Sequence, residues 1–379
     1  MRSRVRRRRA FAGITVTTSP PLRILHLDSG REWRGGQRQV YLLARGQREL
    51  GHGPLVIAAP DAPLICRLRS AGVAAAEVRM RGDWDLAAAG RVRALLRTWN
   101  ADLIHAHDAH AHAIALAALI GRRSVPLIVS RRVVLVPHGR LKYGHRVSRF
   151  IAVSSAVRHA LMTGGIDGSR VDLVYDGVTR PSVSRRRNWR TECQWPEDSV
   201  VCGIVGAMSA EKGVAILSEI RERLSEPSRS RLRLVLLGGK RELTQSIGGF
   251  TTFCAGFVDE IHDAMAGLDI LLHPSSAEGL GTAVIDAVAL GVPPVAFRVG
   301  GLPEVIEDQR SGLLVPAGDV TAFANAIDRL VHDQNLRRLL ATAGPARAAE
   351  FSVERMVEGT QAVYDSVLAS TTQPARKVI

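Results

Sequence analysis

Short apolar runs separated by amphipathic stretches recur along most of the chain. A run of about four to eight apolar residues is typical of a strand buried on both faces of a parallel sheet, whereas apolar residues spaced three or four apart are typical of a helix that covers it. In the first half, the runs predict strands at residues 23–27, 55–59, 103–106, 127–130, 150–153 and 171–175. Helices are predicted between them at residues 37–50, 86–99, 109–120 and 155–163.

A second series of the same kind fills the other half. Its strands are predicted at residues 200–205, 232–237, 270–272, 295–297 and 313–315. Residues 320–368 then alternate apolar and charged positions at helical spacing, with an interruption near Gly344 and Pro345, which predicts two or three closing helices. The two series together predict an α/β protein with two doubly wound sheets.

The length of 379 residues also favours two domains. Residues 181–198 are rich in Arg and Ser, contain two prolines and lack an apolar period, so they are the predicted linker and hinge. The expected organisation is an Arg-rich tail at 1–20, a first Rossmann-like domain at 21–180, a second at 199–350, and a closing helix and tail at 351–379.

The net charge of +15 is concentrated in two short segments. Residues 1–10 contain six Arg and residues 180–190 contain five, with no acidic residue in either. We therefore predict no nucleic-acid partner, although a basic nucleic-acid-binding protein remains as a third alternative. The Arg-rich tail is either attracted to an anionic membrane surface, or a solvated tail, or the product of a start codon placed too early.

The four cysteines occur at no metal-like spacing and fit a reducing cytosol. The apolar stretch at residues 10–18 is interrupted by Gly13 and several Thr, and it is too short for a convincing signal sequence. No other run approaches the length of a membrane span. We expect a cytoplasmic protein whose contact with the inner face of the cell membrane, through its tail, is peripheral.

The strongest motif begins at the end of a predicted strand. Residues 273–293 read HPSSAEGLGTAVIDAVALGVP, which places Glu278 and Gly279 in a strand-to-helix loop and Gly281 near the start of the helix. The amide groups and the dipole at a helix N-terminus favour an anion there. Asp286 follows about one turn into the helix, where a carboxylate suits sugar or ribose hydroxyls. Taken alone, the two acids are better explained as a first-turn charge partner and a surface acid, and only their surroundings favour a binding role.

The order of the surrounding motifs resembles that of the retaining glycosyltransferases of family 4, which have the GT-B fold of two Rossmann-like domains facing a central cleft. The resemblance covers most of the chain. Its motifs are Gly35-Gly36, residues 174–178, Glu211-Lys212-Gly213, Gly238-Gly239, residues 256–258, residues 273–293, residues 300–304 and residues 312–316.

The resemblance implies roles for individual residues. Lys212 would bind the donor diphosphate, Glu278 would hold the hydroxyls of the transferred sugar, and Asp286 would bind the ribose. Lys212 and Glu278 are the predicted catalytic residues, because a cation aimed at a departing diphosphate stabilises the transition state more than the substrate. The remaining predicted donor contacts are Gly35, Gly36, Gly238, Gly279, Leu280, Gly281 and Thr282.

Three positions depart from the family pattern. Ala207 stands where the second basic phosphate ligand is expected, and Asp286 stands in place of a Glu. Arg132 stands where many members place a His after the fourth strand, so no catalytic His is carried over from it. A degenerate, non-catalytic GT-B protein is therefore an open alternative. The expected acceptor or cleft residues are His107, Arg132 and Ser154.

Two further patterns resemble metal sites. The segment from His105 to His112 contains four His and an Asp, which supports the alternative of a metal-dependent hydrolase. A strand end passing into a helix start explains it better, and an acceptor or donor-sugar role at the carboxyl end of the strand is the other alternative. Asp83-Trp84-Asp85 matches the Asp-x-Asp of another glycosyltransferase fold, but it directly precedes a predicted helix, where Asp85 makes a sensible N-cap. We predict no metal and no cofactor requirement.

The resulting hypothesis is a glycosyltransferase with a nucleotide-diphosphate-sugar as its donor substrate. The donor is expected in the second half and the acceptor in the first. By resemblance, the acceptor is a glycan or lipid-linked precursor of a cell-envelope glycolipid or polysaccharide, and the transferred sugar retains its configuration. The nucleotide base, the sugar and the acceptor cannot be read from the residues.

Overall fold

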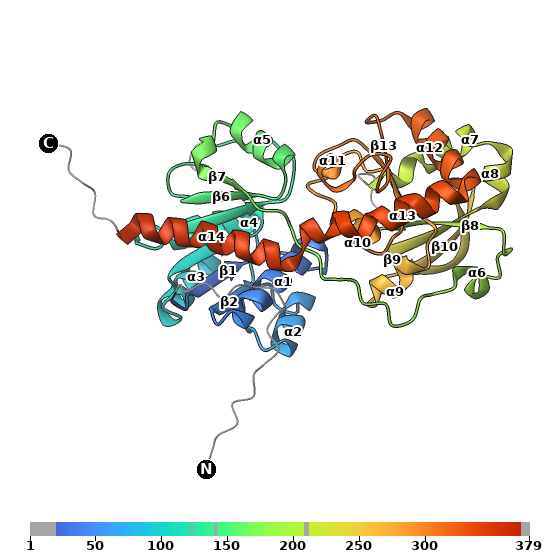
Figure 1. Cartoon of the computed structure of the whole chain (residues 1–379). Coiled ribbons are helices and arrows are strands. Elements are labelled where there is room, and N and C mark those ends of the chain that lie inside the picture. The colour runs from blue at the N-terminus through green and yellow to red at the C-terminus, as the bar shows by residue number, and fades with distance from the viewer. Residues whose placement is uncertain (1–19, 123, 140–141, 208–211, 373–379) are drawn as a thin grey trace, which may run out of the picture. The chain divides into compact units, whose positions relative to one another are not determined.

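The computed structural model describes residues 20–122, 124–139, 142–207 and 212–372 (Figure 1). Contacts divide the chain into two compact units, one formed by residues 1–177 with 353–379 and the other by residues 178–352. The predicted Arg-rich tail, apart from its last residue, and Glu211 lie outside the described residues. No helix in the described part of the chain is long and apolar enough to cross a membrane.

The first unit is built on a seven-stranded parallel sheet with the order β3-β2-β1-β4-β5-β6-β7. The strand order reverses between β1 and β4, which makes this pair the switch point of the sheet. The strands are β1 (Arg23–Leu27), β2 (Gly53–Ala58), β3 (Ala74–Glu77), β4 (Leu103–Ala106), β5 (Leu127–Arg131), β6 (Arg149–Ala152) and β7 (Val171–Leu173).

The first unit contains helices from the first half of the chain and one helix from the end of the chain. α14 (Val353–Thr372) contacts α1 and β6, and it buries Met356 and Val357 against Leu42 and Leu43 of α1 (Figure 1). The predicted closing helix therefore packs on the first unit. The other helices are α1 (Gly35–Glu49), α2 (Pro63–Ser70), α3 (Leu86–Thr98), α4 (Ala109–Ala118), α5 (Ser155–Thr163) and the 3-10 turn η1 (Gly168–Arg170).

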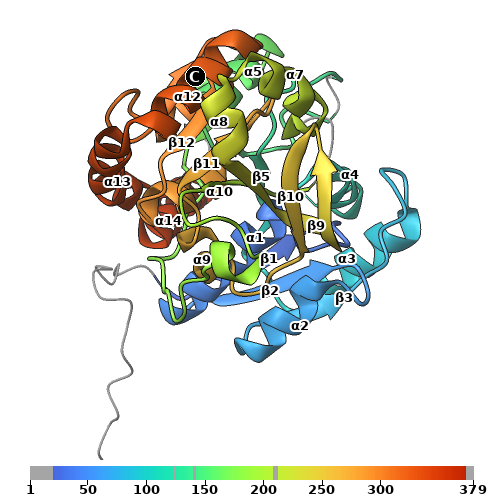
Figure 2. The same ribbon diagram turned by 90° about the vertical axis from the view of Figure 1, so that its right-hand side faces the viewer.

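The second unit contains a six-stranded sheet with the order β10-β9-β8-β11-β12-β13. Its switch point lies between β8 and β11, which pair in parallel. Figure 2 shows β9 and β10 side by side, and β10 is the edge strand. The strands are β8 (Val200–Val205), β9 (Leu232–Ile247), β10 (Phe250–Gly256), β11 (Ile270–His273), β12 (Pro294–Phe297) and β13 (Leu313–Val315).

The predicted linker at residues 181–198 packs within this second unit. Trp189 is fully buried, and its indole N–H donates to the carbonyl of Ala264 at 2.9 Å. The helical segments are α6 (Trp189–Glu192), η3 (Val214–Ile216), α7 (Leu217–Arg223), α8 (Glu226–Arg231), α9 (Ile261–Ala266), α10 (Thr282–Ala289), α11 (Leu302–Val305), α12 (Val320–His332), α13 (Gln334–Ala348) and η4 (Ala349–Phe351).

The interruption predicted near Gly344 and Pro345 is wrong, because α13 continues through both residues. A Cβ on Gly344 would lie 2.4 Å from the carbonyl oxygen of Val288, so the glycine permits close packing of α13 on α10 and does not end a helix. Two strands were not predicted, β3 and β10. β3 reads AAAE and is partly exposed, and β10 reads FTTFCAG, so neither has the continuous large apolar run of a buried strand.

Two glycines inside helices are expected to respond oppositely to alanine. In α1, a Cβ on Gly46 would lie 2.6 Å from Cγ2 of Val357, whereas in α3 a Cβ on Gly90 would meet nothing within 4 Å. Gly46→Ala should destabilise the fold by about 1–3 kcal/mol through overpacking. Gly90→Ala should stabilise it by about 0.5–1 kcal/mol through helix propensity. Urea unfolding followed by circular dichroism measures both, and an unaffected Gly46→Ala protein would contradict the packing of α14 on α1.

Candidate active site

The loop after β11 lies at the switch point of the second sheet. β11 ends at His273, and the chain passes through Glu278 before Gly281 caps α10. Lys212 follows the neighbouring strand β8. Ligands of doubly wound sheets bind beyond the carboxyl ends of strands at such a reversal of strand order. The fold thus places the main predicted donor residues where a ligand is expected.

Lys212 and His273 both contact the same carboxylate oxygen of Glu278. Lys212 Nζ donates to Oε2 of Glu278 at 2.5 Å, and Nε2 of His273 lies 3.0 Å from the same oxygen. The side chains of Lys212 and Glu278 are 26% and 16% exposed, so the pair is only partly screened by solvent. Burial raises the pKa of Glu278, but the hydrogen bonds and charges of His273 and Lys212 outweigh it and hold the pKa at about 2. Glu278 is therefore ionised at neutral pH.

Glycines fix the backbone around this carboxylate. A Cβ on Gly300 would lie 1.7 Å from the carbonyl oxygen of Glu278, and one on Gly213 would lie 2.1 Å from that of Pro274. Both glycines have positive φ, 53° and 74°. Only glycine allows this conformation and this approach together. The close contacts hold the Glu278 loop against the segments that follow β8 and β12.

The other predicted donor residues of the second unit surround the same loop. Gly279 and Leu280 are buried, and Gly281, with a φ of 94°, precedes Thr282 at the start of α10. The first amides of a helix have no partner within it, so this end of α10 suits an anion. Gly238, which follows the first part of β9, has a φ of 135°, and a Cβ there would lie 2.1 Å from the Gly206 carbonyl oxygen.

Asp286 lies on the buried face of α10. It is 2% exposed, and Nε2 of His262 in α9 lies 3.3 Å from its Oδ1. The ribose role of Asp286 remains a prediction. His262 is its neighbour, so any hydroxyl that reaches this carboxylate must do so beside the imidazole.

In the first unit, Gly35 and Gly36 begin α1. The N-cap residue is Arg34, which caps with no side-chain hydrogen bond and pairs instead with Glu32. A Cβ on Gly36 would meet nothing within 4 Å. Gly36 therefore leaves space beside the start of the helix. The contact of Gly35 and Gly36 with the donor remains a prediction.

The histidine-rich segment is divided among different environments. β4 ends at Ala106 and α4 begins at Ala109, so the segment is a strand end that passes into a helix. Asp108 caps α4 by accepting the amides of His110 and Ala111, each at 2.9 Å. His110 is exposed and pairs with Asp83. Asp108 and His110 thus have partners of their own, apart from His105 and His107.

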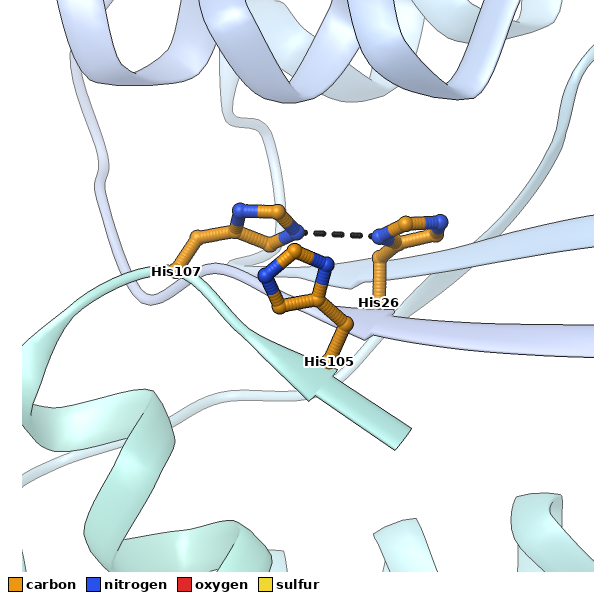
Figure 3. A group of neighbouring side chains, drawn as sticks. All are labelled: His26, His105 and His107. Atoms are coloured by element: carbon orange, nitrogen blue, oxygen red, sulfur yellow. Dashed lines mark hydrogen bonds between the residues drawn. The ribbon is translucent and has the colours of Figure 1, made fainter. Parts of the chain in front are cut away.

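Two histidines of the segment instead join one from β1. His26, His105 and His107 are buried and lie together (Figure 3), and each offers one ring nitrogen that is within 4.8 Å of those of the other two. His26 is on the strand adjacent to β4, opposite His105 in the register. The cluster lies at the switch point of the first sheet. His26 was not among the predicted site residues.

The remaining acceptor candidates have different contacts. Nη1 of Arg132 donates to the carbonyl of His107 at 3.3 Å, and its Nε donates to both carboxylate oxygens of Asp176 at 3.1 and 3.2 Å. Arg132 therefore lies beside His107. Ser154 is fully buried and accepts the amide of Val157 at 3.2 Å, which gives it a capping role at α5.

The prediction that Asp85 caps a helix is confirmed. Its carboxylate accepts the amide of Ala88 at 2.9 Å at the start of α3. Asp83 of the same Asp-x-Asp segment binds Lys142 at 2.7 Å.

Three functional candidates were missed by sequence reasoning, namely His273, His262 and His26. The position of His273, at the carboxyl end of a predicted strand five residues before Glu278, is a usable signal. His262 and His26 have no comparable signal in the sequence, because their partners lie 24 and 81 residues away in the chain.

Known proteins match both halves of the chain. Residues 33–180 match the family described as Glycosyltransferase Family 4, and residues 199–333 match Glycosyl transferases group 1. Both matches are to glycosyltransferase domains, one in each half of the chain. The solved structure of Anabaena HepE in complex with UDP-glucose has the same fold, with a TM-score of 0.77 at 20% identity over 91% of this chain and 100% of that one.

Curated glycosyltransferases are similar in sequence. The D-inositol 3-phosphate glycosyltransferase of Corynebacterium jeikeium is 30% identical over 53% of this chain and 50% of its own length. The enzyme of the same name from Acidothermus cellulolyticus is 28% identical over 83% of this chain and 76% of its own. The chain spans about half the length of the first of these relatives.

Gly300 should be far less tolerant of alanine than Gly318. Both have positive φ, but a Cβ on Gly318 would meet nothing within 4 Å, whereas one on Gly300 would overlap the Glu278 carbonyl. Gly318→Ala should cost about 1 kcal/mol from backbone strain alone. Gly300→Ala should cost about 1–3 kcal/mol more and displace Glu278. Thermal unfolding tests this, and equal costs would contradict the described contact.

Proposed function

We propose that this protein transfers a glycosyl group from a nucleoside-diphosphate-sugar to an acceptor hydroxyl. The observation that carries the proposal is the meeting of Lys212 and His273 on Glu278 at the switch point of the second sheet, beside the start of α10. A cation, a helix N-terminus and a fixed carboxylate provide one group for a diphosphate and one for sugar hydroxyls. The glycosyltransferase domains in both halves support the same reaction class.

In this reaction, the bond between the anomeric carbon and the diphosphate oxygen breaks. A bond from the acceptor oxygen to the same carbon forms, and the acceptor proton passes to the departing phosphate. Negative charge grows on the diphosphate as it leaves, so Lys212 and the α10 N-terminus stabilise the transition state more than the bound donor. Attack on the face from which the phosphate leaves gives retention, which the family resemblance favours.

Glu278 and Asp286 have separate roles in the proposal. Glu278 accepts hydrogen bonds from hydroxyls of the transferred sugar, and His273 fixes its orientation. Asp286 binds the ribose, with His262 at its side. Ala207 supplies no cation, so Lys212 carries more of the phosphate charge than it would beside an Arg.

The acceptor belongs to the first unit in this proposal, with His107 and Arg132 at its site. We propose a cell-envelope glycolipid or polysaccharide precursor, a class suggested by the family resemblance. The similar curated enzymes are named for D-inositol 3-phosphate, so a phosphorylated cyclitol belongs in the same acceptor screen. Contact with anionic lipid and a cytoplasmic location are part of the same proposal.

Removing the cation should weaken donor binding and transfer together. A hydrogen bond to a charged group contributes about 1.5–3 kcal/mol, so Lys212→Ala should lower donor affinity by roughly 10-fold to 100-fold. Calorimetry with UDP, GDP, ADP and their sugars identifies the base and measures the loss. Arg298→Ala, which removes a half-exposed cation paired with Asp308, is the control and should bind normally. An unchanged transfer rate in Lys212→Ala would refute its role.

Transfer should persist in excess EDTA. Lys212 and the α10 N-terminus face the diphosphate in this proposal. The Asp-x-Asp segment is used for capping and an ion pair. A sugar-transfer assay before and after chelation measures this, with restoration by added Mg²⁺ or Mn²⁺ as the comparison. Loss of activity that metal restores would contradict the expectation.

A further inference from the structure

A continuous chain of hydrogen bonds runs through the buried cluster of the first unit. At one end, Nδ1 of His26 lies 2.9 Å from Nε2 of His107 (Figure 3). Nε2 of His26 lies 2.8 Å from Oε1 of Gln47. Gln47 is in α1 and is 1% exposed. Its amide nitrogen lies 3.4 Å from the hydroxyl of Tyr364 in α14. The chain thus links two helices to the sheet.

The other end of the chain passes through His105. Nδ1 of His105 lies 2.6 Å from the Tyr364 hydroxyl, and its Nε2 lies 2.8 Å from Oγ of Ser130. Both ring nitrogens of His26 and of His105 therefore have partners. A metal ion bound by this cluster would have to displace hydrogen bonds that are already made, so the cluster is better described as a relay than as a vacant ligand set.

The direction of the hydrogen bonds between Gln47, His26 and His107 follows from Oε1 of Gln47, which can only accept. With its amide nitrogen toward Tyr364, Gln47 turns Oε1 toward His26, so Nε2 of His26 must carry a proton. Burial lowers the pKa of His26 to about 4, and it lowers those of His105 and His107 well below the ordinary value. Each neutral ring carries a single proton. Nδ1 of His26 is then an acceptor, and Nε2 of His107 must donate to it.

One nitrogen at the end of the relay has no partner. Nδ1 of His107 is buried and makes no hydrogen bond, although the residue is only 5% exposed. In Figure 3 this nitrogen points away from both neighbouring imidazoles. The backbone of His107 is fixed on both sides, by the Leu27 carbonyl at 3.0 Å and by Arg132. An unpaired buried acceptor is unfavourable, and a hydrogen bond from a ligand hydroxyl would satisfy it.

We propose that His26 and Gln47 are positioning residues that fix His107 in the Nε2–H tautomer and so present its Nδ1 lone pair to a hydroxyl of the bound substrate. Neither residue contacts the substrate in this proposal. Gln47 acts through His26, and Tyr364 orients Gln47 from the end of the chain. This inference rests on the proposed function only for the identity of the hydroxyl, because the tautomer is a property of the protein alone.

Nitrogen NMR of the protein labelled in its histidines tests the tautomer directly, since protonated and bare ring nitrogens resonate far apart. In the native sequence, His107 should show a protonated Nε2 and a bare Nδ1. His26→Leu and Gln47→Leu should both abolish this single form. Gln47 does not hydrogen bond to His107, so a response to its loss is not expected of a merely local packing defect.

Conservative and matched variants separate positioning from stability. His26→Asn keeps an acceptor near the former Nδ1 and should retain the Nε2–H form of His107. His112→Phe changes a buried imidazole of the same unit that packs against Tyr143 and Phe150 outside the relay, and it should leave the His107 signals unchanged. With an active donor and acceptor pair, kcat/KM should fall about 10-fold in His26→Leu and Gln47→Leu, and recover in His26→Asn.

Two results would overturn the relay. One is a His107 tautomer that is unchanged in both His26→Leu and Gln47→Leu. The other is stoichiometric zinc in protein incubated with Zn²⁺ and desalted, if that zinc is lost in His26→Leu, because the metal would then occupy the relay nitrogens. If the tautomer responds as expected but no sugar is transferred by the native protein, the proposed function fails and the relay stands.

Discussion

The second unit's site depends on the ion pair between Lys212 and Glu278. A carboxylate that is only 16% exposed has lost most of its hydration, and the charge and hydrogen bonds of Lys212 and His273 compensate for that loss. Both partners bind the same oxygen, Oε2. A diphosphate that attracts Lys212 would therefore leave Glu278 with His273 alone and with capacity to accept sugar hydroxyls. This change of partner for Lys212 couples the binding of the diphosphate to the binding of the sugar within one site.

Histidines accompany both predicted carboxylates of this site. His273 contacts Glu278 and His262 contacts Asp286, each through Nε2. A His is neutral or positive near neutral pH, so it stabilises a buried carboxylate without the fixed charge of Arg or Lys. Two of the three departures from the family pattern, Ala207 and Asp286, thus occur in a site whose acids have local partners.

Sequence patterns predicted the central strands well, because a strand buried on both faces must be apolar at nearly every position. β1, β4, β8 and β13 have the predicted bounds. β3 and β10 were not predicted, because edge strands are paired on one side only and tolerate Ala and Thr. Gly344 was misread because a glycine that permits close helix packing looks like one that ends a helix. Lys212 and Glu278 were predicted from the resemblance of the ordered motifs to a family, but their contact joins residues 66 apart and is a property of the fold.

The polar groups at the two switch points differ in charge: they are charged in the second unit and neutral in the first. In the second unit a charged Lys and Glu remain partly exposed, an arrangement suited to a charged diphosphate. In the first unit the imidazoles are buried, and burial lowers their pKa values so far that they are neutral at physiological pH. A neutral acceptor with a fixed lone pair suits a neutral hydroxyl and does not favour an anion. In the proposed function, the same topological position in two sheets serves two chemically different parts of a glycosyl transfer, and the burial of each cluster decides which part it serves.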